Sequence, residues 1–318
     1  MTIVVHSLSI VTTVYRSRGT IEEFLHRASK AGEAVCKDIE FIVVDDGSPD
    51  DSAKLVRAMA DRDSRITLVQ LSRNFGHHKA MLIGLEQARG DLVFLIDSDL
   101  EEPPELMAGM MQCMKEQSVD CVYGVQIKRK GGAVERLTGR IFYGLFFALS
   151  EVRIPENVST IRLMTRRYVR SLLQFRDKNP VFVPLSIMTG YRQSAYPFDK
   201  KSTSDTTYSL RRRIALALLA ITTFTGKPLQ LMFSLSVFLS VLGLTYGGYV
   251  VLRALSGPTQ DGWSSLMAVV VFFFSLNAVF TGLIGLYVKQ ILEEVKDRPR
   301  VVVQEIYRGI QMVEERDE

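Results

Sequence analysis

Residues 91–99 read DLVFLIDSD, an apolar run that ends in two carboxylates. The run is typical of a β-strand that is covered on both faces, since it does not alternate with polar residues. Four comparable runs accompany the strand predicted at 91–97, and they lie at residues 8–14, 39–45, 66–71 and 119–125. Amphipathic stretches typical of helices lie between them, at residues 20–37, 52–61, 77–88 and 104–116. The alternation predicts an α/β fold with a mainly parallel sheet and flanking helices.

The composition indicates a soluble domain with an attached membrane segment. Apolar residues make up 47% of the chain, which is high for a soluble protein, whereas 23% charged residues are too many for a pure membrane bundle. The basic excess, 39 side chains against 35 acidic ones, is too small to indicate a nucleic-acid partner. The 3 cysteines show neither a CxxC nor a His-paired spacing, so we expect no disulfide framework and no zinc site.

Two apolar stretches near the C-terminus, residues 229–252 and 264–288, are each long enough to cross a membrane as a helix and contain no charged residue. Basic residues precede the first and follow the second, so the positive-inside rule predicts a hairpin with both flanks in the cytoplasm. Residues 136–149 and 208–224 have basic starts and dense apolar residues, as interfacial helices do, although ordinary buried helices are the alternative. The predicted organisation is a cytoplasmic domain over 1–225, a transmembrane hairpin within 229–288 and a cytoplasmic tail over 289–318, in an inner or plasma membrane.

Carboxylates follow two of the predicted strands. Ligands of α/β sheets bind beyond the carboxyl ends of the strands, so Asp97 and Asp99 are placed to converge on a cation. Oxygen ligands select a hard metal, Mg²⁺ or Mn²⁺, which would neutralise charge on a nucleoside-diphosphate leaving group. Two aspartates at this spacing, taken alone, are also typical of a solvated turn after a strand. Asp45 and Asp46 end a second strand at the same edge, where they would either accept hydrogen bonds from a base or ribose or cap a turn.

Three segments, VVDDGSPDDS, LSRNFGHHKA and GDLVFLIDSDLEEPPEL, occur in that order in the chain. Together they resemble the family 2 glycosyltransferases that act on polyprenyl phosphates, such as dolichyl-phosphate mannose synthase and bacterial undecaprenyl-phosphate sugar transferases. IRLMTRR at residues 161–167 and the two C-terminal apolar stretches extend the resemblance over most of the chain. It implies a GT-A fold, a divalent metal and an inverting transfer from a nucleotide-sugar to a polyprenyl phosphate, for cell-envelope glycan or lipid modification. It also implies a membrane-bound homo-oligomer.

The resemblance implies a role for several groups of side chains. Asp97 and Asp99 would be the catalytic and metal-binding residues. The family's DxDLQ is DSDLEE here, a departure that makes Glu101 a candidate for an extra metal ligand or a water-bridging acid. The nucleotide-sugar would contact Thr13, Tyr15, Asp45, Asp46, Lys79, Asp97 and Ser98. Basic side chains would hold the acceptor phosphate, or else face anionic lipid headgroups, and they are Lys128, Arg129, Lys130, Arg162, Lys200, Lys201 and Arg211. A structural ion pair is the alternative for Arg162. The adjacent His77 and His78 point in different directions and do not predict a metal site.

Residues 157–160 read NVST, where the resemblance expects an aspartate that has been considered a base. A phosphate monoester has a second pKa of about 6, so its attacking oxygen is already an anion and needs no base. The departure therefore favours a lipid phosphate over a sugar hydroxyl as acceptor. Two alternatives stay open, a catalytically silent membrane scaffold that binds nucleotide-sugar and a sugar transferase with another acceptor. A processive polysaccharide synthase is disfavoured, because the single tryptophan, Trp263, lies outside any Gln-x-x-Arg-Trp motif.

Overall fold

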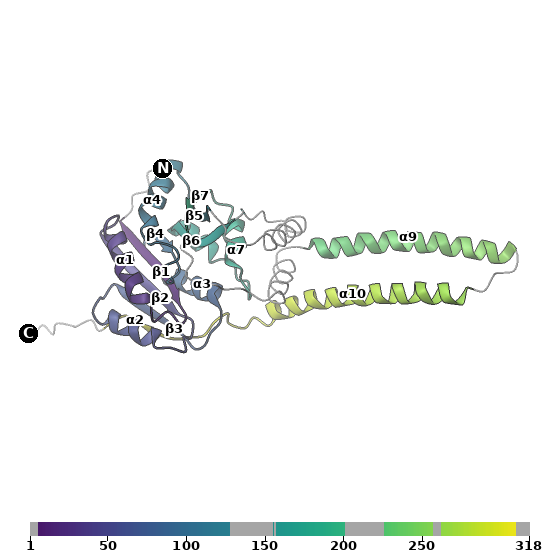
Figure 1. The fold of residues 1–318 in the computed structure, drawn as a ribbon, viewed down its shortest axis with the longest axis horizontal. Helices are drawn as coiled ribbons and strands as arrows, with labels where there is room; N and C mark the ends of the chain where they lie inside the picture. The colour runs from purple at the N-terminus through teal and green to yellow at the C-terminus, as the bar shows by residue number, and fades with distance from the viewer. Residues whose placement is uncertain (1–5, 128–154, 156, 201–225, 257–261, 310–318) are drawn as a thin grey trace, which may run out of the picture. The chain divides into compact units, whose positions relative to one another are not determined.

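The computed structural model describes residues 6–127, 155, 157–200, 226–256 and 262–309. They fall into two compact units, which Figure 1 shows as an α/β unit and a pair of long helices. The α/β unit contains the described residues up to 200 together with 298–309, and the helical unit contains those from 226 to 297. The predicted interfacial helices at 136–149 and 208–224 lie outside the described residues.

A mixed sheet forms the centre of the α/β unit, with the strand order β7-β5-β6-β4-β1-β2-β3-β8. Its strands are β1 (Ser7–Val14), β2 (Asp38–Asp45), β3 (Ile66–Leu71), β4 (Leu92–Leu95), β5 (Cys121–Gln126), β6 (Val158–Thr165), β7 (Gln193–Phe198) and β8 (Val303–Tyr307). Strands β3, β2, β1 and β4 are mutually parallel, and β5 is parallel to β7. Strand β6 runs antiparallel to β4 and β5, and β8 runs antiparallel to β3. The predicted α/β class with a mainly parallel sheet is confirmed, and all five predicted strands form.

Helices cover both faces of this sheet (Figure 1). They are α1 (Ile21–Glu33), α2 (Ser52–Ala60), α3 (His77–Gln87), α4 (Leu106–Gln117), α6 (Arg166–Leu172) and α7 (Phe182–Met188). Apolar residues of α1, α2 and α4 share one core cluster with Ile10 of β1 and Phe94 of β4. On the other face, a Cβ at Gly84 of α3 would lie 2.5 Å from Val11 Cγ1 and 3.0 Å from Val44 Cγ2. Glycine at this position therefore allows α3 to lie directly against β1 and β2.

The tail strand β8 closes one edge of the sheet against β3. This part of the C-terminal tail therefore pairs with the sheet of its own chain. Arg57 of α2 forms an ion pair with Glu305, and its guanidinium lies 4.2 Å from the centroid of the Tyr307 ring. These contacts attach the residues that follow the second long helix to the α/β unit.

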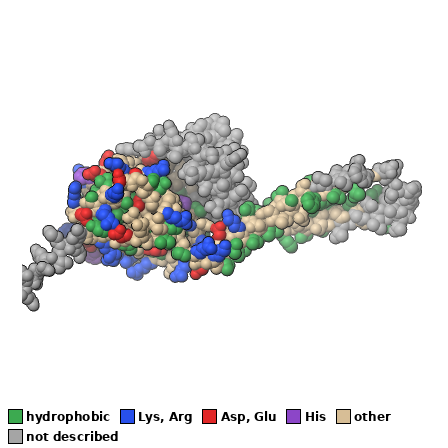
Figure 2. Space-filling model, turned by 90° about the horizontal axis from the view of Figure 1, so that it is seen from below, with side chains coloured by type: hydrophobic (Ala, Val, Ile, Leu, Met, Phe, Trp, Pro, Cys, Tyr) green, Lys and Arg blue, Asp and Glu red, His purple; other side chains and the backbone are tan. Residues whose placement is uncertain are grey.

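The helical unit consists of α9 (Lys227–Ser256) and α10 (Trp263–Val295). Apolar side chains are exposed along the described part of the helical unit (Figure 2). They include Phe233 of α9 and Phe274 of α10. Within the described part of the chain, Phe272–Val295 is long and apolar enough to cross a membrane, whereas Lys227–Gly243 is a shorter apolar stretch. One candidate span is therefore found in α10, and the two-span hairpin stays a prediction.

Candidate active site

The carboxyl ends of β1, β2 and β4 meet at one edge of the sheet, because parallel neighbours end on the same side. Asp45 is the last residue of β2, and Asp97 lies two residues after the end of β4. Thr160, near the start of the antiparallel strand β6, comes to the same edge from the opposite direction. The topology thus gathers side chains that are far apart in the sequence.

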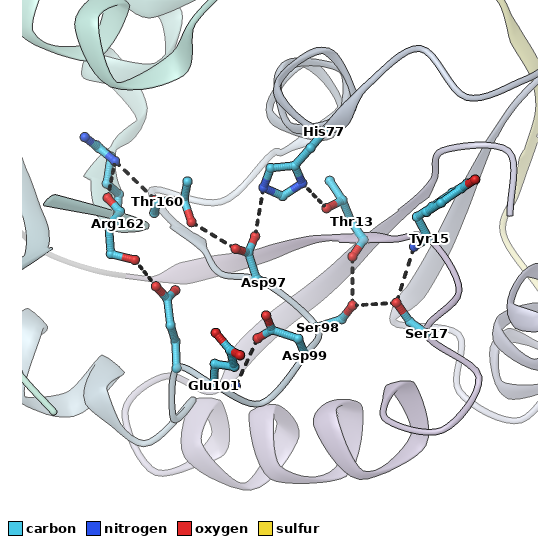
Figure 3. Close-up of polar contacts among 12 residues, drawn as sticks. Thr13, Tyr15, Ser17, His77, Asp97, Ser98, Asp99, Glu101, Thr160 and Arg162 are labelled. Carbon is cyan, nitrogen blue, oxygen red and sulfur yellow. Dashed lines mark hydrogen bonds and ion pairs between the residues drawn. The ribbon is translucent and has the colours of Figure 1, made fainter. Parts of the chain in front are cut away.

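Asp97 is held by two side chains from different elements (Figure 3). Its Oδ1 lies 3.2 Å from Nε2 of His77, and its Oδ2 accepts a hydrogen bond of 3.0 Å from the Thr160 hydroxyl. Burial acts to raise the pKa of Asp97, but the hydrogen bond and charge of His77 outweigh it and hold that pKa below its usual value. Asp97 is therefore an ionised carboxylate with a fixed orientation, and 22% of its side chain is exposed.

Asp99 and Glu101 lie beside Asp97. The exposed Asp99 accepts a hydrogen bond of 2.9 Å from the backbone N–H of Glu101, which shapes the turn after β4. The Glu101 carboxylate lies 2.9 Å from Nζ of Lys200, which follows β7 by two residues. The sequence assigned Glu101 to the metal and Lys200 to the acceptor phosphate, and the structure pairs these two side chains with each other.

Glu102 and Arg162 are both buried near these residues, and the charge of Arg162 acts on the Glu102 carboxyl group. Glu102 accepts a hydrogen bond from the Ser159 hydroxyl, and among the described residues its Oε2 has no hydrogen-bond partner. Burial, followed by the charge of Asp97, raises the pKa of Glu102 to about 8. At neutral pH this environment favours the protonated, neutral form of Glu102.

Arg162 belongs to the scaffold of the site, which corrects its predicted contact with the acceptor phosphate. Only 1% of Arg162 is exposed, so a phosphate has no access to it in this structure. Its Nη1 donates to the carbonyl oxygens of Ser159 (3.0 Å) and Thr160 (3.2 Å), and its Nη2 donates to the hydroxyl of Ser186 (3.0 Å). The guanidinium also lies 5.0 Å from the centroid of the Phe182 ring. The sequence could not reveal this burial, since β6 was not among the predicted strands.

The ends of β1 and β4 are tied together by hydroxyl groups (Figure 3). The buried Ser98 donates a hydrogen bond of 2.8 Å to the carbonyl oxygen of Thr13, and its oxygen lies 3.3 Å from the Ser17 hydroxyl. The Thr13 hydroxyl lies 3.0 Å from Nδ1 of His77. Tyr15 is 44% exposed and donates its backbone N–H to the Ser17 hydroxyl. Among these residues, which were predicted to contact the nucleotide-sugar, Tyr15 is exposed, whereas Thr13 and Ser98 are buried. Thr13 and Ser98 instead hold the ends of β1 and β4 together.

Asp45 and Asp46 are buried and bonded to the backbone. Asp46 accepts hydrogen bonds from the N–H groups of Phe75 (2.7 Å) and Gly76 (3.0 Å), and Asp45 accepts one from Ser48 (3.2 Å). Asp46 thereby holds the segment before α3 against the end of β2. Of the two roles left open for Asp46, the structure supports the turn-capping one.

The remaining predicted residues divide into two groups. Lys79 lies in the first turn of α3, two residues after His77, and is partly buried. The other predicted acceptor contacts lie outside the described residues, and they are Lys128, Arg129, Lys130, Lys201 and Arg211.

Sequence reasoning missed His77, Thr160, Ser17 and Ser159 as members of the site. Position 77 opens a helix directly after a strand and its turn, which was the available signal for the histidine. The hydroxyl groups gave no signal, because Ser and Thr occur throughout the chain.

Asp97 and Asp99 fit a divalent cation that brings further ligands with it. Among the residues that the structure describes, no three His, Cys, Asp or Glu side chains form a group that could hold a metal ion. Mg²⁺ usually binds through one or two carboxylates, with waters and substrate phosphates as the other ligands, so two carboxylates suffice.

A profile described as glycosyl transferase family 2 matches residues 9–197, a range that contains Asp97 and Asp99. A Mycobacterium tuberculosis (strain CDC 1551 / Oshkosh) protein named "Putative glycosyltransferases" is 38% identical over 301 residues, covering 94% of this chain and 88% of that protein. An undecaprenyl-phosphate 4-deoxy-4-formamido-L-arabinose transferase of Pseudomonas syringae pv. syringae (strain B728a) is 30% identical over 309 residues, covering 95% and 91%. Among solved structures, mannosyltransferase PcManGT from Pyrobaculum calidifontis in complex with GDP-Man and Mn²⁺ is similar, with a TM-score of 0.49, 18% identity and coverage of 91% and 86%.

Proposed function

The chain belongs to glycosyl transferase family 2, and we propose that it moves a sugar from a nucleotide-sugar to a polyprenyl phosphate, undecaprenyl phosphate in particular. The relative named as an undecaprenyl-phosphate sugar transferase supports this class of acceptor. In the proposed reaction a phosphate oxygen of the lipid attacks the anomeric carbon from the face opposite the nucleoside diphosphate. The configuration at that carbon inverts, and the product is a polyprenyl-phosphate-sugar for cell-envelope glycan or lipid modification.

The observation that carries the proposal is the pair of carboxylates at the end of β4. Asp97 is fixed by His77 and Thr160, and the exposed Asp99 follows two residues later. In our proposal these two residues hold Mg²⁺ or Mn²⁺. When bound, the cation would neutralise the charge that develops on the leaving diphosphate. Glu101 is a further candidate ligand once it separates from Lys200.

The surroundings of the site favour an acceptor that is already an anion. The hydroxyls of Ser159 and Thr160, in the segment where an acidic residue was expected, are bonded to Glu102 and Asp97. A sugar hydroxyl requires a general base, whereas a phosphate monoester with a pKa of about 6 is ionised at neutral pH. Lys200 is the described cation placed near the carboxylates, and we propose that it contacts the acceptor phosphate. Lys128, Arg129, Lys130, Lys201 and Arg211 are proposed to do so as well.

A lipid acceptor requires a membrane location, and α10 supplies an apolar segment of sufficient length. We propose that residues 229–288 anchor the protein in an inner or plasma membrane as a two-helix hairpin. The catalytic domain, residues 1–225, and the tail, residues 289–318, would then lie on the cytoplasmic side, where nucleotide-sugars are available. Assembly as a homo-oligomer is part of the same proposal.

The test is transfer of radiolabelled sugar into a lipid extract. Membranes containing the full chain are mixed with undecaprenyl phosphate and a panel of UDP-, GDP- and dTDP-sugars. We expect one donor to label the lipid, and we expect Asp99→Asn to abolish the labelling. The matched control is Asp38→Asn, since Asp38 is an exposed carboxylate at the other end of the sheet. Binding of a nucleotide-sugar without any turnover would support the silent scaffold instead, and near-normal turnover by Asp99→Asn would contradict the metal assignment.

A further inference from the structure

We propose that His77 is a positioning residue for Asp97, and that it sets the orientation in which this carboxylate meets a divalent cation. The inference rests on the metal site of the proposed function. It adds to that function a residue that neither binds the metal nor touches the substrates.

Both ring nitrogens of His77 are engaged. Nε2 lies 3.2 Å from Asp97 Oδ1, and Nδ1 lies 3.0 Å from the Thr13 hydroxyl. An imidazole Nε2 that faces a carboxylate carries a proton and donates it. Because Thr13 engages the other nitrogen, a rotation of the ring would break two contacts, so the donor stays directed at Asp97.

Asp97 is fixed from its other side as well. Its Oδ2 accepts the hydrogen bond from Thr160 on β6, while His77 on α3 holds Oδ1. Each carboxylate oxygen can accept more than one hydrogen bond or metal contact, so both oxygens keep lone pairs for a cation. Figure 3 shows the resulting chain of contacts from Thr13 through His77 and Asp97 to Thr160.

The consequence is a ligand that is oriented before the metal arrives. A free aspartate side chain loses rotational freedom when it binds an ion, whereas Asp97 has already lost it on folding. Partners that orient metal ligands typically account for about 10–100-fold in metal affinity. The adjacent His78 is hydrogen-bonded to the backbone of Pro180 instead.

The experiment measures Mn²⁺ binding to the purified full chain in detergent, without donor or lipid, by electron paramagnetic resonance of free Mn²⁺. Three substitutions at one position separate the two ring contacts. His77→Ala removes both. His77→Asn places an amide near the position of Nδ1 and keeps the contact with Thr13, and His77→Gln places an amide N–H₂ near the position of Nε2 and keeps the contact with Asp97.

We expect the Kd for Mn²⁺ to rise by about 10–100-fold in His77→Ala and in His77→Asn. His77→Gln should restore most of the affinity, and His26→Ala, at an exposed position on α1, should leave it unchanged. A Kd in His77→Asn equal to that of wild type would overturn the proposal. So would an affinity in His77→Gln as low as in His77→Ala at an unchanged melting temperature, because a merely structural role would not separate these variants.

The result is independent of the sugar-transfer assay. If the wild-type chain binds no Mn²⁺, the metal site of the proposed function fails and the inference fails with it. If the wild-type chain binds Mn²⁺ and all three variants bind it equally well, the role of His77 alone is refuted.

Discussion

Replacing Arg162 by methionine tests whether this arginine supports the site or binds phosphate. Methionine keeps an apolar side chain in the space that Arg162 fills. It removes the hydrogen bonds that the guanidinium donates to the carbonyls of Ser159 and Thr160 and to the Ser186 hydroxyl. It also removes the positive charge near the buried Glu102, whose pKa is already raised by burial and by Asp97. The predicted result is a less stable α/β unit.

The magnitude follows from the burial of the group. Removing one partner of a buried charged network costs about 3–5 kcal/mol, because the groups left behind lose their partners without access to water. For a domain of this size, about 2–4 °C of melting temperature correspond to each kcal/mol, so we expect a decrease of about 6–20 °C. Because Arg162 bonds to two carbonyls next to the side chains that hold Asp97 and Glu102, transfer activity should decrease as well.

The assay is thermal unfolding of the full chain in detergent, with Arg170→Met as the matched control. Arg170 is exposed on α6, so its replacement should leave the melting temperature close to that of wild type. A different pattern would refute the reasoning. If Arg162→Met melts like wild type and only the KM for the lipid phosphate rises, the arginine contacts the acceptor and its burial does not define its role.

Three further predictions concern a glycine, a surface network and the metal. Gly47 has a φ of +64°, and a Cβ there would clash with the backbone of Arg73. Gly47→Ala should therefore lower the free energy of unfolding by about 1–3 kcal/mol. Denaturant titration measures this change, and an unchanged midpoint would contradict the prediction. Arg65 lowers the pKa of Asp63 through a side-chain hydrogen bond. The folding free energy that this contact contributes is therefore fully present above the unfolded-state pKa of Asp63, about 3.9. It is lost as pH falls through the lower pKa that Asp63 has in the folded protein. The melting temperatures of wild type and Arg65→Met should therefore converge as pH falls from 7 towards 3, and a constant difference would argue against this coupling. EDTA should abolish sugar transfer and added Mn²⁺ or Mg²⁺ should restore it, whereas full activity in EDTA would show that the acidic residues bind no essential metal.

The strands were predictable because their chemistry is local. A run such as LVFLI between polar segments has few other ways to be buried than as a strand covered on both faces, and β4 forms inside that run. The antiparallel strand β6 was missed although its sequence, VSTIRLMT, is rich in β-formers. It contains Arg162, and a charged residue in a strand usually indicates an exposed position. Here hydrogen bonds that the guanidinium donates to three oxygen atoms offset its burial, and no sequence pattern predicts such partners.

The α/β class, and the position of Asp97 and Asp99 beyond the carboxyl end of a parallel strand, could be predicted from the sequence. Both follow from local periodicity and from the rule that neighbouring parallel strands end on the same side. The contacts of those carboxylates depend on the tertiary structure. It turned Asp46 and Arg162 inward, paired Glu101 with Lys200, and placed His77 and Thr160 on either side of Asp97. The physical reason is that hydrogen-bond partners between different elements depend on how α3 and β6 pack against the central strands, which is a property of the whole core.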